Sequence, residues 1–582
     1  MTDNNFSKLN SSPKSQKVAI FGAGIAGLAA AHEAVKMGFK VVVYECDEVA
    51  GGFARSGRSE LGMPTEYSWR GFGPWYHNVF TMMKQIPNRT GNGSVYEKEL
   101  SRQISFAIVP DKVGKQQLGI RAWLGVRGCA LMILILLRSF VADKRGHQLY
   151  SRLNASEYLK LWLPSETHKA VISTFGPWIG TDSERTSLHH LGTFHRKNMW
   201  PGYPAPHHHP ADELGASWYH GNGDGWLILK GPSNEVWFNP WVKELKSQGV
   251  EFYFSTKLER LNATKEKVTS AVVFDKKNKK ELSVDADYYI VAVTPFAFRD
   301  IVDASSNAVQ QDAECKKFNQ LIAEGPHIQI GFQIGFAEKI KFTGEWQAVI
   351  LRDSEYCLTI FPDDLIFHED IQLGENVKSL WTGTVTWSYL QGELTKRTAA
   401  QCTKDELKRE ILYQIFRSDG LDQLVKKSNE GKSLQYFPIV QMEIWSSWIF
   451  PEVPSDYMHV TAPQHKWSNT INTQPYHPST YTSIANLLLA GSHTQVSVDL
   501  WSMEGAAESG RRAAFALDLD HKIRLQRNEE HCELFEQRQP KFFHFCSKLD
   551  NFLYALGLPN LVDVTLIAFI LAIVVCITLS VR

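Results

Sequence analysis

The stretch Lys17-Val-Ala-Ile-Phe-Gly22-Ala-Gly24-Ile-Ala26-Gly27-Leu28 opens the part of the chain that decides the fold. Val18 to Phe21 is a short apolar run that ends in glycine, as expected of a parallel strand buried on both faces. Good helix formers follow as far as Gly38, which suits a left-handed helix C-terminus, and Val41 to Tyr44 is a second apolar run. These residues predict a βαβ unit.

The spacing of the glycines indicates a dinucleotide-binding turn between the first strand and the helix. Gly22 makes the tight turn, Gly24 lets a pyrophosphate approach the backbone, and Gly27 lets the helix pack closely on the strand, with Ala26 in the same turn. The N–H groups at the helix start then face the phosphates. Glu45 stands 18 residues after Gly27, where an acidic residue binds a ribose hydroxyl and disfavours a 2′-phosphate.

A second glycine pair follows in Gly51-Gly52-Phe-Ala-Arg55-Ser56. This segment resembles the one after the dinucleotide fingerprint in the superfamily of flavin amine oxidases, carotenoid (phytoene) desaturases and protoporphyrinogen oxidases. The resemblance implies that the bound dinucleotide is FAD. Gly51 and Gly52 would give a second close backbone approach, and Arg55 would neutralise the pyrophosphate from its far side.

A second motif lies near the other end of the chain, from Asn486 to Gly510. It has the order strand, glycine turn, loop and helix start, and resembles the C-terminal FAD motif of the same superfamily, closest to the desaturase and isomerase branch. The helix start would stabilise the negative charge of reduced flavin. The residues that this resemblance assigns to FAD are Gly491, Ser492, Met503, Glu504 and Gly505. Ser492 departs from the family, where an acidic residue is usual.

The same resemblance suggests further positions around the cofactor. Leu258 would meet the adenine half of FAD through its backbone, and Trp69, Arg70 and Trp501 would lie at the flavin edge or the substrate channel. Gln329 stands near the place where flavin amine oxidases have a lysine, which weakens an amine oxidase interpretation. No catalytic side chain is identified, because the flavin itself would take the hydride.

Composition excludes several classes of function. Charge is balanced, with 62 basic and 62 acidic residues, so binding to nucleic acid is not expected. The eight cysteines have no CxxC or disulfide-like spacing and are expected to be reduced. Histidines gather at His189, His190, His195 and 207–209. We expect no metal there, because adjacent side chains diverge and no ligand motif accompanies them.

Two apolar stretches suggest a membrane. The uncharged core of residues 119–141 spans 10 residues, too few to cross a bilayer, and flanking arginines favour a helix in the membrane interface over a buried core helix. Residues 564–581 form 18 consecutive uncharged positions and, with Leu561 and Val562, reach the spanning length. We expect a C-terminal tail anchor with the rest of the chain facing the cytosol.

The predicted fold class is α/β: a Rossmann-like FAD-binding domain (GR2 type) of discontinuous segments, an inserted α+β substrate domain and a C-terminal transmembrane helix. The FAD-binding segments are residues 17–110, 236–300 and 481–520, and the substrate segments are 111–235 and 301–480. A disordered leader (1–16), linker helices (521–560) and the transmembrane tail (561–582) complete the chain.

The expected function is a membrane-associated FAD-dependent oxidoreductase that removes hydride from a lipophilic substrate such as a carotenoid, a terpenoid or another lipid. The alternatives are a flavin amine oxidase of the same fold, a redox-neutral flavin-dependent polyene isomerase, and a non-catalytic membrane-tethered scaffold. The expected partners are the lipophilic substrate and membrane lipid, while the electron acceptor is unknown.

Overall fold

The computed structural model describes residues 16–102, 105–109, 120–163, 165, 168–169, 171–172, 184–199, 203–206, 226–342, 346–519, 534–538 and 541–580. The leader over residues 1–15 and the histidines at 207–209 lie outside these ranges.

A five-stranded sheet of wholly parallel strands organises the first domain, in the order β10-β2-β1-β14-β20. Its strands come from three distant parts of the chain: β1 (Lys17–Phe21), β2 (Lys40–Tyr44), β10 (Glu251–Tyr253), β14 (Tyr288–Val291) and β20 (Leu487–Leu489). Apart from the exposed edge strand β10, the sheet is buried on both faces, which explains why these strands are apolar runs without alternation. The predicted βαβ unit and the return of the chain to this sheet are therefore correct.

Different elements cover the two faces of this sheet. Val18, Ile20 and Val41 face a core shared with α1 (Ile25–Lys36), α9 (Asn239–Ser247) and α16 (Met503–Leu519). Ala19 and Phe21 face the antiparallel sheet β11-β12-β13 and α10 to α13. The bounds here are β11 (Thr256–Ala263), β12 (Val268–Asp275), β13 (Lys280–Val284), α10 (Pro295–Ala304), α11 (Asn307–Gln311), α12 (Ala313–Lys316) and α13 (Phe318–Leu321).

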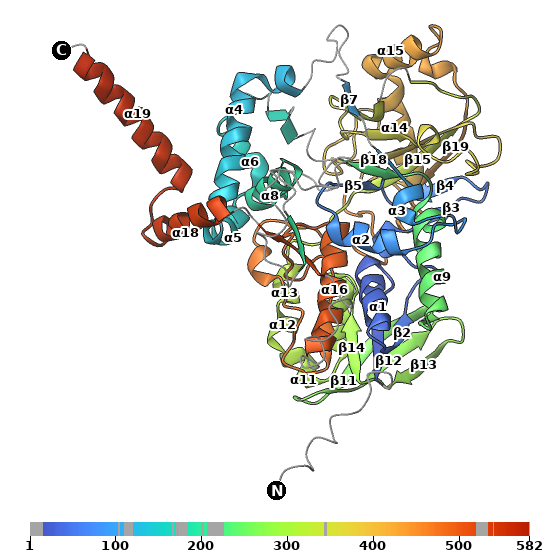
Figure 1. Cartoon of the computed structure of the whole chain (residues 1–582). Coiled ribbons are helices and arrows are strands. Elements are labelled where there is room, and N and C mark those ends of the chain that lie inside the picture. The colour runs from blue at the N-terminus through green and yellow to red at the C-terminus, as the bar shows by residue number, and fades with distance from the viewer. Residues whose placement is uncertain are drawn as a thin grey trace.

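Helices α1 and α16, from opposite ends of the chain, lie side by side on the sheet (Figure 1). Their backbones approach so closely that a Cβ on Gly510 would lie 2.0 Å from the Ala26 carbonyl oxygen. This contact brings the two predicted cofactor motifs to the same edge of the sheet.

A second domain is built on a six-stranded sheet in the order β19-β15-β18-β17-β16-β7. Helices α14 (Lys404–Phe416) and α15 (Asp419–Ser428) pack on it through apolar faces, and a capping box at Thr403 begins α14. The strands are β7 (Ser105–Val109), β15 (Ile330–Phe336), β16 (Trp346–Leu351), β17 (Thr359–Pro362), β18 (Ser379–Val385) and β19 (Ile439–Ile444).

Smaller sheets and helices join the domains. The sheets are β3 (Ser56–Arg58) with β4 (Pro64–Glu66), β5 (Gly71–Phe72) with β9 (Leu227–Leu229) and β6 (Leu100–Arg102), and β8 (Tyr203–Pro206) with β21 (Phe535–Arg538). The helices here are α2 (His77–Gln85) and α3 (Val95–Lys98).

A helical layer lies to one side of both domains, on the left of Figure 1. It contains α4 (Ile120–Val141), α5 (Lys144–Gln148), α6 (Ala155–Lys160) and α8 (Leu188–Met199), and α18 (Lys541–Ala555) and α19 (Leu561–Ser580) extend from it. Among the described residues, one helix is long and apolar enough to cross a membrane, over Leu561–Leu579. None of its residues is buried: the first four are half-buried against the protein and the rest are exposed.

The structure corrects three details of the sequence interpretation. Residues 250–258 suggest a single strand by their composition, but they form two strands, because Ser255, with a φ of +55°, turns the chain between β10 and β11. Strand β7 pairs with β16 in the second domain, although residues up to 110 were assigned to the first. The segment 521–560, expected to be helical, includes strand β21, which pairs with β8. No disulfide joins the cysteines that the structure describes.

Candidate functional site

A cavity of about 440 Å³ lies between the two domains, at the carboxyl ends of the parallel strands. This edge is where open α/β sheets place their ligands. Of the site residues predicted from sequence, those that line the cavity are Gly22, Gly24, Ala26, Glu45, Gly51, Gly52, Trp69, Arg70, Leu258, Gln329, Gly491, Ser492, Trp501 and Met503. Gly27, Arg55, Glu504 and Gly505 do not line it.

The glycine loop before α1 leaves open space in front of the helix start. A Cβ built on Gly24 meets a single atom within 4 Å, the Gly52 Cα at 3.8 Å, so the space beside Gly24 is open. A Cβ on Gly52 would lie 3.1 Å from the Gly24 Cα, so the two glycine backbones lie close together. Gly51 and Gly52 have φ values of +117° and +55°, which favour glycine. The loop therefore forms a cradle of backbone groups at a helix N-terminus, and it fits the phosphates of a dinucleotide.

Glu45 fixes the shape of this cradle from the end of β2. Its Oε2 accepts a hydrogen bond from the Ala23 N–H at 2.6 Å, and its Oε1 accepts one from the Asp47 N–H at 2.9 Å. Burial raises the pKa of Glu45, and these two N–H groups oppose that rise. The buried acid at this strand end suits the hydroxyl groups of a ribose.

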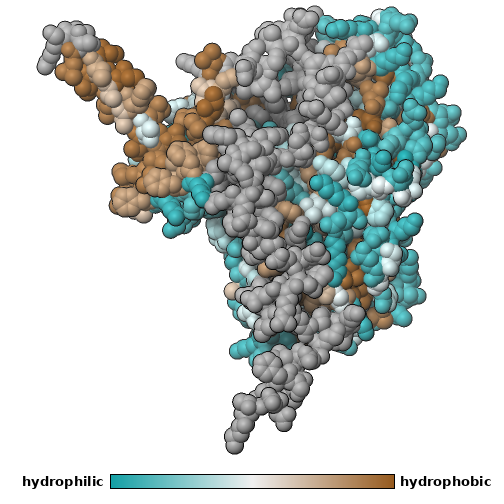
Figure 2. Space-filling model, viewed as in Figure 1, coloured by the Kyte–Doolittle hydropathy of each residue, from teal (hydrophilic) through white to brown (hydrophobic). Residues whose placement is uncertain are grey.

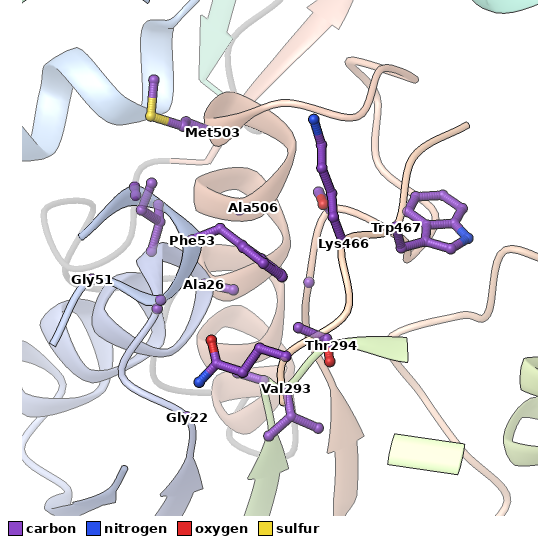
Figure 3. Close-up of a pocket in the computed structure, with 18 of the residues that line it drawn as sticks. Gly22, Ala26, Gly51, Phe53, Val293, Thr294, Lys466, Trp467, Met503 and Ala506 are labelled. Atoms are coloured by element: carbon purple, nitrogen blue, oxygen red, sulfur yellow. The ribbon is translucent and has the colours of Figure 1, made fainter. Parts of the chain in front are cut away.

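The start of α16 closes the cavity from the C-terminal motif. Figure 3 shows Met503 at the helix start and Ala506 one turn further on, both beside the cavity. The Ser502 hydroxyl accepts a hydrogen bond from the Gly505 N–H at 3.1 Å and so caps the helix. The positive end of a second helix dipole thus points to the same space as the first.

Glu504 has a different position from the predicted one, because it caps α2. Its Oε1 accepts hydrogen bonds from the backbone N–H and the Nδ2 of Asn78, both at 2.8 Å, and its Oε2 accepts one from the Val79 N–H at 3.0 Å. Burial raises the pKa of Glu504 to about 7, although these three donors favour its charged form. Glu504 therefore holds α2 against α16 and does not face the cavity.

A buried ion pair extends this network across the two ends of the chain. Arg511 Nε of α16 lies 2.8 Å from Glu33 Oε1 of α1, with exposed side-chain fractions of 1% and 2%. Arg511 Nη1 also donates to Asn78 Oδ1 at 2.9 Å. The relative position of the two cofactor motifs is thereby fixed by charge as well as by packing.

The remaining predicted residues outside the cavity also have structural roles. A Cβ on Gly27 would lie 1.8 Å from the Gly22 carbonyl oxygen, which is the close packing that its spacing indicated. Gly505 likewise packs against the Leu500 carbonyl. Arg55 pairs with Asp47 at 3.2 Å and donates to the Gly52 carbonyl oxygen at 2.8 Å, so its charge supports the glycine loop from behind.

Aromatic side chains dominate the part of the cavity next to the second domain. Trp69 stacks on Phe361 with ring centroids 4.5 Å apart, and Trp75 meets Trp226 edge to face at 5.3 Å. Arg70 lines the same region, but its guanidinium donates to four backbone carbonyl groups, including those of residues 53 and 54. Arg70 thus holds the wall together.

Lys466 is a cavity residue that the sequence did not reveal. It is 2% exposed, its Nζ donates to Gln329 Oε1, and it lies 4.5 Å from the centre of the Trp501 ring. Figure 3 shows it reaching toward the end of the cavity where Met503 lies, away from Gly22. Lys466 thus contacts the glutamine that the sequence analysis singled out. No short motif marks Lys466, because it lies in a loop 137 residues from its partner.

Helix α8 contributes two further cavity residues, His190 and Phe194, that were not assigned from sequence. Beside them, Asp499 Oδ2 accepts hydrogen bonds from His189 Nε2 at 2.7 Å and His147 Nε2 at 3.0 Å. These three side chains form one of two groups in the described part of the chain that could hold a metal ion. The other is Glu45, Cys46 and Asp47, which belongs to the ribose end described above.

Comparison with known proteins supports the fold. Residues 20–86 match the family model described as an NAD(P)-binding Rossmann-like domain. A search of curated proteins found no match.

Three solved structures are similar over most of the chain. Putrescine oxidase bound to putrescine has a TM-score of 0.57 and 12% identity, covering 87% of this chain and 99% of its own. Cyclohexylamine oxidase from Brevibacterium oxydans IH-35A has a TM-score of 0.56 and 14% identity with the same coverage. An oxidoreductase from Methanosarcina mazei has a TM-score of 0.54 and 13% identity, covering 85% and 99%. These likenesses establish a Rossmann-like α/β fold shared along both domains.

Proposed function

We propose that this protein is a membrane-associated, FAD-dependent oxidoreductase that removes hydride from a lipophilic substrate. The observation that carries the proposal is the shared cavity, in which the starts of α1 and α16 meet over Gly24 and Gly52. Two helix N-termini and a buried acid suit the pyrophosphate and ribose of one dinucleotide. The fold, shared with enzymes named as oxidases, supports a redox role.

The chain's own residues would bind and orient the cofactor and keep water out. The glycine loops would hold the pyrophosphate, Glu45 the ribose, and the start of α16 the flavin ring. FAD, when bound, accepts a hydride from the substrate carbon. The aromatic wall around Trp69 and Trp75 would exclude water and present an apolar face to the substrate.

The charges in the cavity favour a neutral substrate over an amine. Near the aromatic wall, the charged lining residues are the cations Lys466 and Arg70. The acids among the described lining residues are Glu45 and Asp47, which lie by the glycine loop at the end of β2. A protonated amine next to Lys466 would be repelled in a site with little water. An uncharged polyene or other lipid carries no such cost.

A bilayer source for this substrate is supported by the helices next to the cavity. Helix α8, which provides His190 and Phe194, packs against α4 so closely that a Cβ on Gly192 would lie 2.9 Å from Ser139. Helix α4 in turn is joined to α19 by an ion pair between Arg138 and Asp563 at 2.5 Å. The candidate membrane span is therefore two helices away from the cavity wall.

Amine oxidation is the second candidate, because aromatic rings that surround the cavity also suit an alkylamine and because two of the similar structures are amine oxidases. The two functions are separated by anaerobic titration of the purified flavoprotein. Bleaching of the flavin by extracted lipids supports the proposal, and bleaching by amines alone would contradict it. An isomerase would give a third result: neither lipids nor amines would bleach the flavin, and product would form from lipid only after the flavin had been reduced in advance.

Gly24→Val tests the cofactor site directly. Gly24 has a φ of −72° and open space at its Cβ, so the variant should fold, while the new methyl groups fill the phosphate space. We expect a protein with unchanged circular dichroism and gel-filtration profile that contains no flavin. A folded Gly24→Val protein that remains yellow would contradict the proposed site.

A further inference from the structure

Helix α18 exposes a stripe of large apolar side chains. The large apolar side chains most exposed on α18 and just after its end are Phe542, Phe545, Leu549, Phe552 and Leu556, spaced by three and four residues in alternation. Such spacing places them on one stripe along the helix. The exposed fraction reaches 69% at Phe542 and 63% at Phe552.

The face of α18 that packs on the protein carries Ser547 and Asp550, whereas Lys541, His544 and Lys548 are exposed beside the apolar stripe. Asp550 is fully buried and pairs with Arg145 of α5 at 3.0 Å. Ser547 is also buried, and Phe543 stacks on Phe140 of α4 with centroids 4.4 Å apart. A helix on a water-facing surface turns its large apolar side chains inward. An exposed apolar stripe with basic side chains beside it is instead typical of a helix in a membrane interface.

The same contacts fix α18 relative to the candidate membrane span. Asp550 Oδ1 accepts a hydrogen bond from the Leu561 N–H, the first residue of α19, at 2.8 Å. Arg145 donates to the carbonyl oxygens of Leu558 and Pro559 in the turn between the two helices. Helix α19 is thus held by the protein body and is not attached through a flexible linker.

A second exposed stripe lies on α4, which packs against both α18 and α19. Val126, Ala130, Ile133 and Leu137 are exposed at a spacing of four, three and four residues. Figure 2 shows that apolar surface continues from α19 over α18 toward α4, whereas hydrophilic side chains cover much of the opposite side of the molecule. The stripes therefore adjoin the candidate membrane span of the described residues, α19.

We propose that the exposed stripe of α18, together with the exposed face of α4, lies in the boundary between the headgroups and acyl chains of the membrane that α19 crosses. This inference rests on the proposed membrane association. The membrane would then hold the body of the protein at a fixed height and orientation, with the apolar stripe buried about 5–10 Å into the boundary between headgroups and acyl chains. A second copy of the chain is the competing occupant of this surface.

Photo-crosslinking to lipid tests the proposal on the full-length protein. The purified chain is reconstituted in phosphatidylcholine vesicles that contain a phospholipid with a diazirine on its acyl chain, irradiated, and digested for peptide mapping. We expect lipid adducts on α19, on residues 542–556 and on residues 126–137. The peptide that carries Tyr457, an exposed aromatic residue distant in sequence with an exposed fraction of 93%, is the internal control and should carry none.

The variant Phe545→Ser/Phe552→Ser should lose the α18 adducts and keep those on α19, since both side chains point outward and their removal leaves the packing against α4 intact. Adducts confined to α19, or crosslinks between two copies through α18, would overturn the proposal. Adducts on neither helix would overturn the membrane association as well. Flavin content, measured in the same samples, reports separately on the cofactor site.

Discussion

Replacement of Arg511 by methionine should weaken the protein far more than loss of a surface ion pair. Arg511 and Glu33 are buried, and their atoms lie 2.8 Å apart. The variant leaves the Glu33 carboxylate in the core without its main cation, at a cost of about 3–5 kcal/mol. Total stabilities are about 5–15 kcal/mol, so the loss should be visible as a large shift in urea midpoint.

The cost should fall when both charges are removed. Glu33→Leu/Arg511→Met leaves no unpaired charge in the core, so a double-mutant cycle should give a coupling energy of about 2 kcal/mol or more. The assay is urea unfolding in detergent, followed by tryptophan fluorescence. Because α1 and α16 both line the cavity, flavin should also dissociate at lower urea from Arg511→Met than from the parent.

The matched control is Arg260→Met. Arg260 and Glu281 are also 2.8 Å apart, but their exposed fractions are 37% and 52%. Water screens this pair, so its loss should hardly change the urea midpoint. Equal costs for Arg511→Met and Arg260→Met, or a double variant as unstable as Arg511→Met alone, would refute the reasoning.

Three further predictions concern packing, pH and charge. Gly27→Ala should fail to accumulate as folded protein, because its Cβ would lie 1.8 Å from the Gly22 carbonyl oxygen; a soluble, flavin-loaded variant would contradict this packing. Burial raises the pKa of Glu504 to about 7 from an ordinary 4.5. Its contribution to the free energy of unfolding is therefore complete below pH 4.5, and about 3 kcal/mol is lost as the pH rises through 7. The urea midpoint of the parent should be lower at pH 8 than at pH 5, and that of Glu504→Gln should not show this decline. An equal decline in both proteins would contradict the role of Glu504. Lys466→Met should strengthen binding of a long-chain alkylamine and leave binding of its hydrocarbon analogue unchanged, as measured by perturbation of the flavin spectrum; unchanged amine binding would show that Lys466 does not repel cations.

The sequence predicted the parts of the site that depend on local backbone chemistry. Gly22, Gly24 and Gly52 are informative because a tight turn, a helix start and a positive φ each favour glycine at a fixed position in the motif. The start of α16 is likewise marked by Ser502 and the small residues after it. Fourteen of the eighteen predicted positions line one cavity as a result.

Other parts could not be predicted because they depend on contacts between distant segments. Glu504 caps α2 through Asn78, 426 residues away, and Lys466 reaches the cavity through a loop without a motif. Arg55 lies in the expected segment, yet Asp47 holds its guanidinium behind the glycine loop. The exposed stripe of α18 is visible in the sequence only as helical periodicity, which does not say which face is buried.

The central claim is that the two glycine-lined helix starts hold one FAD, and cofactor content tests it most directly. The full-length protein is purified in detergent, its absorption spectrum is recorded, and the cofactor released by acid is identified and counted by chromatography. We predict a yellow protein that releases one FAD per chain. A colourless protein that takes up no FAD on incubation, or that binds NAD(H) in its place, would contradict the account.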